Sequence, residues 1–82
     1  MENKIKELTL LLMYLTSWKD NEFGNPDNRT WKGYAFNILK ELTDEGYIYG
    51  SIKSKSVYLS DEGNELAKEL IEKYGINEKN DL

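Results

Sequence analysis

The fold of this chain is decided by residues 39–63, which read LKELTDEGYIYGSIKSKSVYLSDEG. Apolar and polar residues alternate within 47–51 and again within 56–60, which is typical of short β-strands. Residues 52–55 join these segments and are mostly polar and basic, so the two strands are predicted to form a hairpin with a basic tip. One face of the hairpin carries Ile48, Val57 and Leu59, and the other carries Tyr47, Tyr49 and Tyr58.

A helix is expected before the hairpin, from about Tyr34 to Glu45. Helical spacing places its buried stripe at Ala35, Ile38, Leu39 and Leu42, with Phe36 as a further candidate. Gly46 follows at the position where a residue in the left-handed conformation commonly ends a helix.

A further helix is expected after the hairpin, from Asp61 to Tyr74. Ser60 precedes it as the capping residue, and the acids Asp61 and Glu62 occupy the first turn, where the helix dipole favours negative charge. Gly75 ends it. The apolar stripe consists of Leu66, Ala67, Leu70, Ile71 and Tyr74. We expect residues 1–75 to form a single domain and residues 76–82 to be a frayed polar tail.

The N-terminal segment predicts a helix from Glu2 to Trp18. Its apolar stripe is Ile5, Leu8, Leu11, Leu12 and Leu15, and it is widened by Leu10, Met13, Tyr14 and Trp18. A helix that is apolar nearly all round is either central to the fold or shared with a partner chain. We therefore expect a homodimer formed through the first or the last helix.

The segment between the first two helices, residues 19–30, is expected to be a loop. Asn, Asp, Gly and Pro cluster there, and these residues favour turns. Phe23 is the exception and is a candidate to hold the loop against the body of the domain. The usual middle helix of a helix-turn-helix is missing, and this loop takes its place.

Composition excludes several classes of protein. The chain has 82 residues, a net charge of -4, no His and no Cys. A disulfide scaffold, a thiolate nucleophile and a Cys/His zinc site are all excluded. No imidazole can act as a general base, there is no glycine-rich phosphate loop, and no spacing of Asp and Glu resembles a calcium loop. We therefore expect no catalytic function, no metal site and no cofactor.

The sequence also bears on location. The longest apolar run, Leu10 to Leu15, is far shorter than the ~20 residues that span a bilayer, and it lacks the flanks of a signal peptide. We expect a cytoplasmic protein without a membrane anchor.

The choice of basic and amide residues bears on the source of the chain. Ten Lys against one Arg, with eight Asn, indicates an AT-rich genome and a low-GC bacterium.

The order of elements resembles the second half of bacterial winged-helix transcriptional regulators, in which a recognition helix precedes a wing and a dimerisation helix. The matching positions are Leu39, Leu42, Gly46, Ile48, Tyr58, Leu59, Ser60 and Gly63. The resemblance implies an α+β fold: a small winged-helix-like domain with a helix, a loop, a helix, a two-stranded β-hairpin wing and a C-terminal helix. Because winged helices also bind proteins, it implies less about function.

A closer resemblance covers most of residues 5–74. Residues 11–16, 29–36 and 53–63 look like a small bacterial family of winged-helix type, a domain of unknown function. Its most specific marks are the Trp-Lys-Gly motif at 31–33 and the Lys-x-Lys-Ser-Val motif at 53–57. Two departures are visible, since the loop over 19–28 is longer than expected and Ala35 stands where an acidic residue is more usual. The resemblance implies a fold but no activity.

The hairpin tip is the first candidate site. Between Tyr47 and Ser60 there are two Lys and no acid. Lys53 and Lys55 would contact DNA phosphates, with Ser54 and Ser56 as neutral donors. The alternative is a solvated turn, or an edge strand that its lysines protect from aggregation.

The helix before the hairpin is a weaker candidate. Asn37 could read adenine, and Lys32 and Lys40 would position the helix on DNA. Its three acids at 41, 44 and 45 outnumber Lys40 and would repel phosphates. The alternative is an ordinary solvated helix face.

The segment Arg29 to Tyr34 combines two aromatics with two cations. Trp31 and Tyr34 are candidate partner-binding residues, because Trp, Tyr and Arg are enriched at binding hot spots. Trp18 and Tyr14 of the first helix join them as candidates. The alternative is that Trp31 packs into the core and Gly33 allows a tight turn, while Lys32 points outward.

Two functions follow from these sites. The first is a DNA-binding or transcription-regulatory accessory protein that contacts double-stranded DNA through its basic wing. The second is a non-catalytic protein–protein interaction module that keeps the fold without binding DNA. A DNA-binding protein should place its four lysines on one face, whereas an interaction module should expose an apolar patch of several hundred Å².

Overall fold

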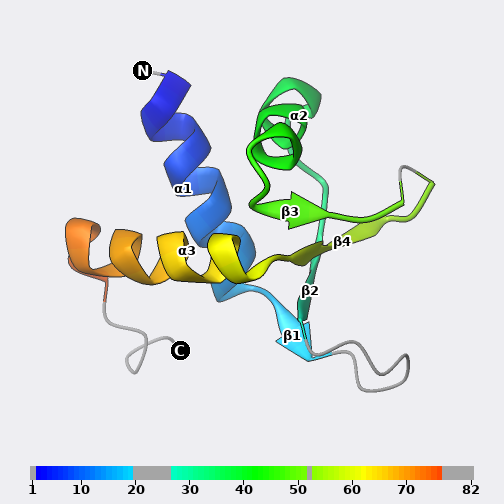
Figure 1. Ribbon diagram of the computed structural model, residues 1–82. Coiled ribbons are helices and arrows are strands. Elements are labelled where there is room, and N and C mark those ends of the chain that lie inside the picture. The colour runs from blue at the N-terminus through cyan, green and yellow to red at the C-terminus, as the bar shows by residue number, and fades with distance from the viewer. Residues whose placement is uncertain (1, 20–26, 52, 77–82) are drawn as a thin grey trace.

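The computed structural model describes residues 2–19, 27–51 and 53–76. Along these residues the elements are α1 (Glu2–Leu15), β1 (Trp18–Lys19), β2 (Asn28–Trp31), α2 (Phe36–Asp44), β3 (Ile48–Tyr49), β4 (Ser56–Leu59) and α3 (Asp61–Tyr74). Figure 1 shows α1 and α3 packed on one side of the strands, with α2 above β3. The predicted α+β class is confirmed, and the arrangement is consistent with a small winged-helix-like domain.

The predicted hairpin is present as β3 and β4, which pair antiparallel with Ile48 opposite Leu59 and Tyr49 opposite Tyr58. Its inward face is as expected, because Ile48 is 2% exposed, Val57 7% and Leu59 0%. The hairpin belongs to a larger antiparallel sheet, whose four strands have the order β1-β2-β4-β3. The sheet is thus wider than the two-stranded wing that the sequence predicts.

The prediction of a loop over residues 19–30 is wrong at both ends, and Lys19 belongs to β1. Residues 28–31 form β2, which pairs with β4 and aligns Thr30 with Val57. Both of these side chains are buried. The strand was missed because it is short, lies next to turn-forming residues and is stabilised by a partner far along the chain. Phe23 lies outside the described residues.

The first helix ends earlier than predicted, at Leu15, and Trp18 belongs to β1. Two hydroxyl groups end it by donating to its last carbonyl groups. Thr16 Oγ1 lies 2.8 Å from the carbonyl oxygen of Leu12, and Ser17 Oγ lies 2.6 Å from that of Tyr14. Such local side-chain bonds compete with continuation of a helix. The helix therefore ends at Leu15, and β1 can begin at Trp18.

The buried face of α1 also differs from the predicted stripe. Of the predicted stripe, Leu11 is buried and Leu15 packs against the core, but Ile5 is 51% exposed, Leu8 43% and Leu12 47%. Leu10 and Met13 are completely buried instead. Helical spacing favours the predicted stripe, but the opposite face of the helix is apolar as well, so spacing does not decide which face is buried. The choice is made by α2 and α3, which both pack against α1. The core that results contains Leu10, Leu11, Met13, Ile38, Leu42, Ile48, Val57, Leu59 and Leu70.

Helix α2 begins at Phe36, two residues later than predicted, and buries Ile38 and Leu42. Phe36 is 78% exposed and Ala35 is also exposed, so neither belongs to the buried stripe. Ala35 is the N-cap residue and offers no side-chain hydrogen bond to the helix. Gly46 ends the helix as predicted, with a φ of 84°.

Helix α3 has the predicted bounds. Ser60 Oγ accepts a hydrogen bond from the Gly63 amide at 3.0 Å and donates to the Gly46 carbonyl at 2.5 Å. Gly75 ends the helix with a φ of 66°. Ile76 packs against the core, and residues 77–82 lie outside the described part of the chain.

A polar cluster joins α1 to α3 at the surface. The Glu7 carboxylate accepts hydrogen bonds from the Tyr74 hydroxyl at 2.7 Å and from Lys73 Nζ at 3.0 Å. These two contacts, that of Tyr74 first, hold the pKa of Glu7 below its ordinary value. The stability that they contribute is therefore present at neutral pH and is lost as pH falls through the lowered pKa.

We expect Tyr74→Phe to raise the pKa of Glu7 toward its ordinary value, because the variant lacks the main hydrogen bond to the carboxylate. The variant should be less stable than wild type at pH 7, and this difference should shrink as pH falls below about 4 and Glu7 becomes protonated in both proteins. Urea unfolding at several pH values and an NMR titration of Glu7 would measure these effects. A stability difference that is the same at pH 3 and pH 7 would contradict the role of Glu7.

Candidate functional site

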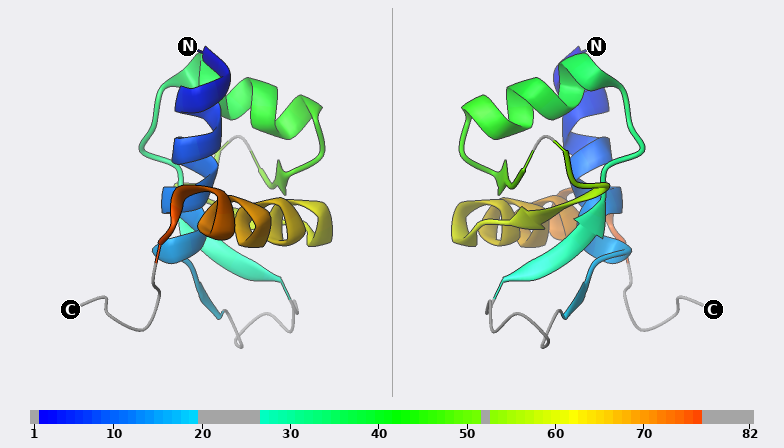
Figure 2. Two further views of the ribbon diagram at one scale, coloured as in Figure 1. Left: turned by 90° about the vertical axis from the view of Figure 1, so that its left-hand side faces the viewer. Right: turned by 90° about the vertical axis from the view of Figure 1, so that its right-hand side faces the viewer.

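The sheet has one face that the described helices do not cover, as the right-hand view in Figure 2 shows. Side chains alternate along a strand, and Thr30, Val57 and Leu59 point into the core. The neighbouring positions therefore point outward. This outward set, which we call the aromatic face, consists of Trp18 on β1, Arg29 and Trp31 on β2, Ser56 and Tyr58 on β4, and Tyr49 on β3.

The rings of the aromatic face form two pairs. The Trp18 and Trp31 ring centroids lie 5.0 Å apart at an interplanar angle of 47°. Those of Tyr49 and Tyr58 lie 5.4 Å apart and are stacked at 23°. Trp31 is 58% exposed and Tyr49 is 38% exposed, while the other two rings are half-buried. The sheet therefore presents ring surface from all four strands.

Arg29 lies between the two pairs, because it is opposite Trp18 of β1 and opposite Tyr58 of β4. Its guanidinium carbon lies 5.3 Å from the centre of the Tyr58 ring, within the range of a cation–π interaction. Its Nε donates to Ser56 Oγ at 2.6 Å. At the far edge, the Tyr49 hydroxyl donates to Asp27 Oδ2 at 2.5 Å. Contacts of this kind hold the side chains in fixed orientations before any ligand binds.

Charge is unevenly divided between the two halves of the molecule. The strands and the segments that join them, residues 18–32 and 47–60, contain five cations and three acids. The cations are Lys19, Arg29, Lys32, Lys53 and Lys55, and the acids are Asp20, Glu22 and Asp27. The three helices contain nine acids and five lysines. The strand half is therefore basic although the whole chain has a net charge of -4.

The predicted phosphate-binding residues lie at the tip of the β3–β4 hairpin. Lys53 and Lys55 are both exposed. Ser54 is half-buried and takes part in the turn, where its hydroxyl accepts from the Ser56 amide at 3.3 Å and its amide donates to the Ser51 carbonyl at 3.2 Å. The two lysines are therefore better placed than Ser54 to meet a ligand.

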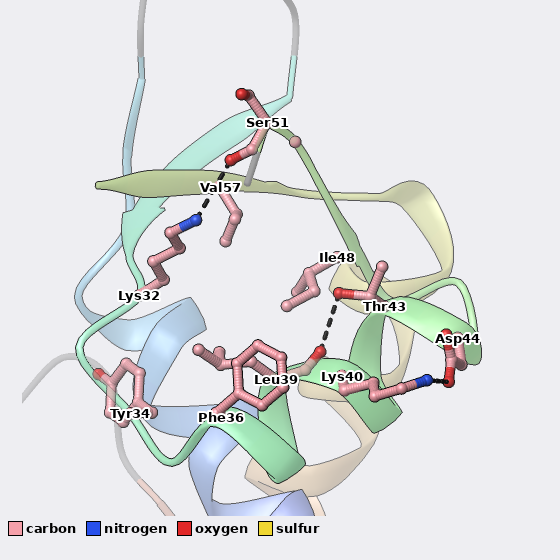
Figure 3. A pocket seen from close by; sticks show the side chains of 11 residues that line it. Lys32, Tyr34, Phe36, Leu39, Lys40, Thr43, Asp44, Ile48, Ser51 and Val57 are labelled. Atoms are coloured by element: carbon pink, nitrogen blue, oxygen red, sulfur yellow. Dashed lines mark hydrogen bonds and ion pairs between the residues drawn. The ribbon is translucent and has the colours of Figure 1, made fainter. Parts of the chain in front are cut away.

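A groove of about 540 Å³ lies between α2 and the hairpin and contains two more of the predicted residues (Figure 3). Lys32 Nζ donates to the Ser51 carbonyl oxygen at 3.2 Å on one side of the groove. On the other side, Lys40 pairs with Asp44 at 2.9 Å. The floor of the groove is apolar and includes Tyr34, Leu39, Ile48 and Val57. Asn37 is exposed on α2 and does not line it.

The acids of α2 are partly neutralised by α1. Lys6 Nζ lies 2.8 Å from Glu45 Oε2 and 3.7 Å from Glu41 Oε1. The hydrogen bond from Lys6 to Glu45 is the main reason why the pKa of Lys6 is raised. These acids therefore connect two helices and do not act only as a repelling surface.

The four predicted partner-binding residues separate into two groups. Trp18 and Trp31 meet on the aromatic face, whereas Tyr14 and Tyr34 are half-buried and pack against the core. The alternative that Trp31 packs into the core is wrong, since the residue is 58% exposed. Sequence reasoning missed Arg29, Tyr49 and Tyr58 as part of one site, although the alternation in the hairpin already placed both tyrosines on its outward face.

The described residues contain no group of three or more Asp and Glu side chains arranged to hold a metal ion. Among the helices they form, none has the length and apolar character needed to cross a membrane.

Fold and surface together define a class: a small α+β domain, consistent with a winged-helix-like arrangement, that has a basic sheet with aromatic side chains on its outward face. The chain belongs to the family described as "Domain of unknown function (DUF6429)", whose family model matches residues 1–77. This confirms the expected membership of a family of unknown function. No curated protein and no solved structure matches the chain significantly.

Proposed function

We propose that this domain is a non-catalytic, DNA-binding accessory protein that contacts the phosphate backbone through its basic strand half. The observation that carries the proposal is the charge division described above, with five cations against three acids on the strands and the segments that join them. Phosphate contacts supply most of the affinity of non-specific DNA binding, and Lys and Arg are the residues that make them. A cytoplasmic location follows from this proposal.

The hairpin is the main contact in this proposal. Lys53 and Lys55 are exposed at its tip and have no acid beside them in the sequence. Lys40 contributes less, because it is paired with Asp44. About two to four phosphate contacts per chain would give a slope of about −2 to −4 when log affinity is plotted against log salt concentration.

We expect wild-type protein to bind a labelled random duplex at ~50 mM salt and to lose about 15- to 250-fold in affinity at ~200 mM salt. Lys53→Glu/Lys55→Glu should abolish this binding, because two phosphate contacts become two repulsions. Fluorescence anisotropy would measure both effects, with circular dichroism as the check that each variant is folded.

Lys4→Glu/Lys68→Glu is the matched control, since it changes net charge by the same amount at two exposed positions on α1 and α3. It should keep most of the affinity. Equal losses in the two double variants would mean that only overall charge matters and that the hairpin has no special role. Folded wild-type protein that does not bind at ~50 mM salt would overturn the proposed function.

A protein-interaction module is the second candidate. It is supported by Phe36, which is 78% exposed at the apolar groove between α2 and the hairpin. Large exposed apolar side chains around a groove are typical of surfaces that bind another protein. This candidate keeps the fold and requires no affinity for DNA, so the titration described above separates the two.

The exposed apolar stripe of α1 supports a homodimer within the proposed function. Ile5, Leu8 and Leu12 lie on the side of the helix opposite to the buried Leu10 and Met13. A second copy of the chain could cover this stripe with its own. Dimerisation would double the number of phosphate contacts and so strengthen otherwise weak binding.

A further inference from the structure

The aromatic face is not needed for phosphate contacts at the hairpin tip, and its chemistry points to a more specific ligand. We infer that this face binds the unpaired bases of single-stranded DNA by stacking. The inference rests on the proposed function, because it names the form of DNA that the domain would prefer.

The first argument is the arrangement of the rings. Each of the four strands supplies one aromatic side chain, in the order Trp18, Trp31, Tyr58 and Tyr49 across the sheet. Adjacent strands are about 4.8 Å apart, so the row crosses about 14 Å of sheet. Such a row could hold roughly two or three stacked bases.

The second argument is preorganisation. The two ring pairs are in contact at 5.0 and 5.4 Å, and Arg29 is held between them by Ser56. Rings that are already fixed by the sheet lose little conformational freedom when a ligand stacks on them. Exposed rings of this size cost solubility unless a partner covers them, which favours a binding role.

The third argument is charge complementarity, which favours DNA over a second copy of the chain or an acidic peptide. Arg29 lies within the row, and Lys53 and Lys55 extend from the same hairpin as Tyr49 and Tyr58. A second copy of this face would bring like charges together, so self-association here is disfavoured. An acidic peptide would satisfy the cations but has no flat bases to stack on four rings.

Base pairing decides between the two forms of DNA. In a duplex the bases are already stacked on one another and their faces are closed to a protein. In a single strand the bases can stack on aromatic side chains while the phosphates meet a basic surface. The aromatic face therefore fits a single strand, whereas the lysines of the hairpin could meet either form.

The test uses the chain's only two tryptophans, which both lie on this face, so that intrinsic fluorescence reports on it alone. We expect a labelled oligothymidine to quench the tryptophan fluorescence of wild type and to bind more tightly than a duplex of equal length. Trp31→Leu should weaken single-strand binding about 5- to 150-fold, which corresponds to the loss of one stacked base. Its affinity for duplex should stay the same.

Phe36→Leu is the matched control, because it makes the same kind of change at an exposed ring outside the aromatic face. It should leave both affinities unchanged, and thermal unfolding would confirm that both variants are folded. Equal affinity of wild type for single strand and duplex, unaltered by Trp31→Leu, would overturn the inference and leave the proposed function standing.

Two other outcomes also have a definite meaning. Quenching by poly-glutamate without binding of either DNA would identify an acidic protein partner and overturn both the inference and the proposed function. Binding of neither ligand by folded protein would overturn both as well.

Discussion

Alanine in place of Gly63 is expected to destabilise the domain by about 3 kcal/mol, at the upper end of what overpacking usually costs. Gly63 is buried in the first turn of α3. A Cβ atom built there would overlap the carbonyl oxygen of Tyr47, which is a backbone atom and cannot rotate away. The substitution therefore has to separate α3 from the start of the hairpin.

The surrounding hydrogen bonds resist that separation. The same Tyr47 carbonyl accepts from the Ser60 amide at 3.0 Å, and the Ser60 hydroxyl donates to the Gly46 carbonyl at 2.5 Å. Moving Tyr47 away from α3 would break both contacts. Intrinsic helix propensity favours alanine over glycine by about 1 kcal/mol and so predicts the opposite sign. We expect the steric overlap to dominate.

Urea unfolding of wild type, Gly63→Ala and Gly33→Ala would measure the effect. Gly33 is an exposed glycine whose added Cβ would meet nothing within 4 Å. Its substitution should change the free energy of unfolding by no more than about 0.5 kcal/mol. A Gly63→Ala variant as stable as wild type, or more stable, would show that Gly63 and the backbone of Tyr47 are not in this close contact.

Leu10→Ala is the second substitution with a large expected effect, a loss of about 2–5 kcal/mol. Leu10 is completely buried in the core, where α1 meets its neighbours. A domain of 82 residues has a total stability of roughly 4–12 kcal/mol. Leu10→Ala would therefore remove a large share of it and leave a measurable unfolded population at 37 °C.

Leu8→Ala is the matched control on the same helix. Leu8 is 43% exposed, so the same substitution should cost less than about 1 kcal/mol in dilute solution. Helical spacing alone predicts that Leu8 belongs to the core stripe. A larger loss for Leu8→Ala than for Leu10→Ala would therefore favour the sequence-based stripe and contradict the structure.

Sedimentation of Leu8→Ala tests the proposed homodimer. If the exposed stripe of α1 forms the dimer interface, this variant should have a lower dimer fraction than wild type.

The hairpin and α3 could be predicted because their signals are local. Alternation over 47–51 and 56–60 defines the strands and their inward face. Ser60 and Gly75 mark the two ends of α3 by capping. Each signal involves neighbours within a few residues, so no knowledge of the rest of the fold is needed.

Strand β2 and the buried face of α1 were decided by contacts between distant parts of the chain. Residues 28–31 become a strand because their backbone pairs with β4, whose residues 56–58 lie more than twenty positions away. Helix α1 is apolar on opposite faces, and only its packing against α2 and α3 determines that Leu10 is buried and Leu8 exposed.

The candidate site depends on the same long-range pairing. The sequence alone determined that Tyr49 and Tyr58 share the outward face of a hairpin and that Lys53 and Lys55 lie at its tip. Only the pairing of β2 with β4 brings Trp31 and Arg29 beside them, and only the pairing of β1 with β2 adds Trp18. Hydrogen bonds between strands far apart in the chain leave no periodic signal in either strand, so this face exists only in the tertiary structure.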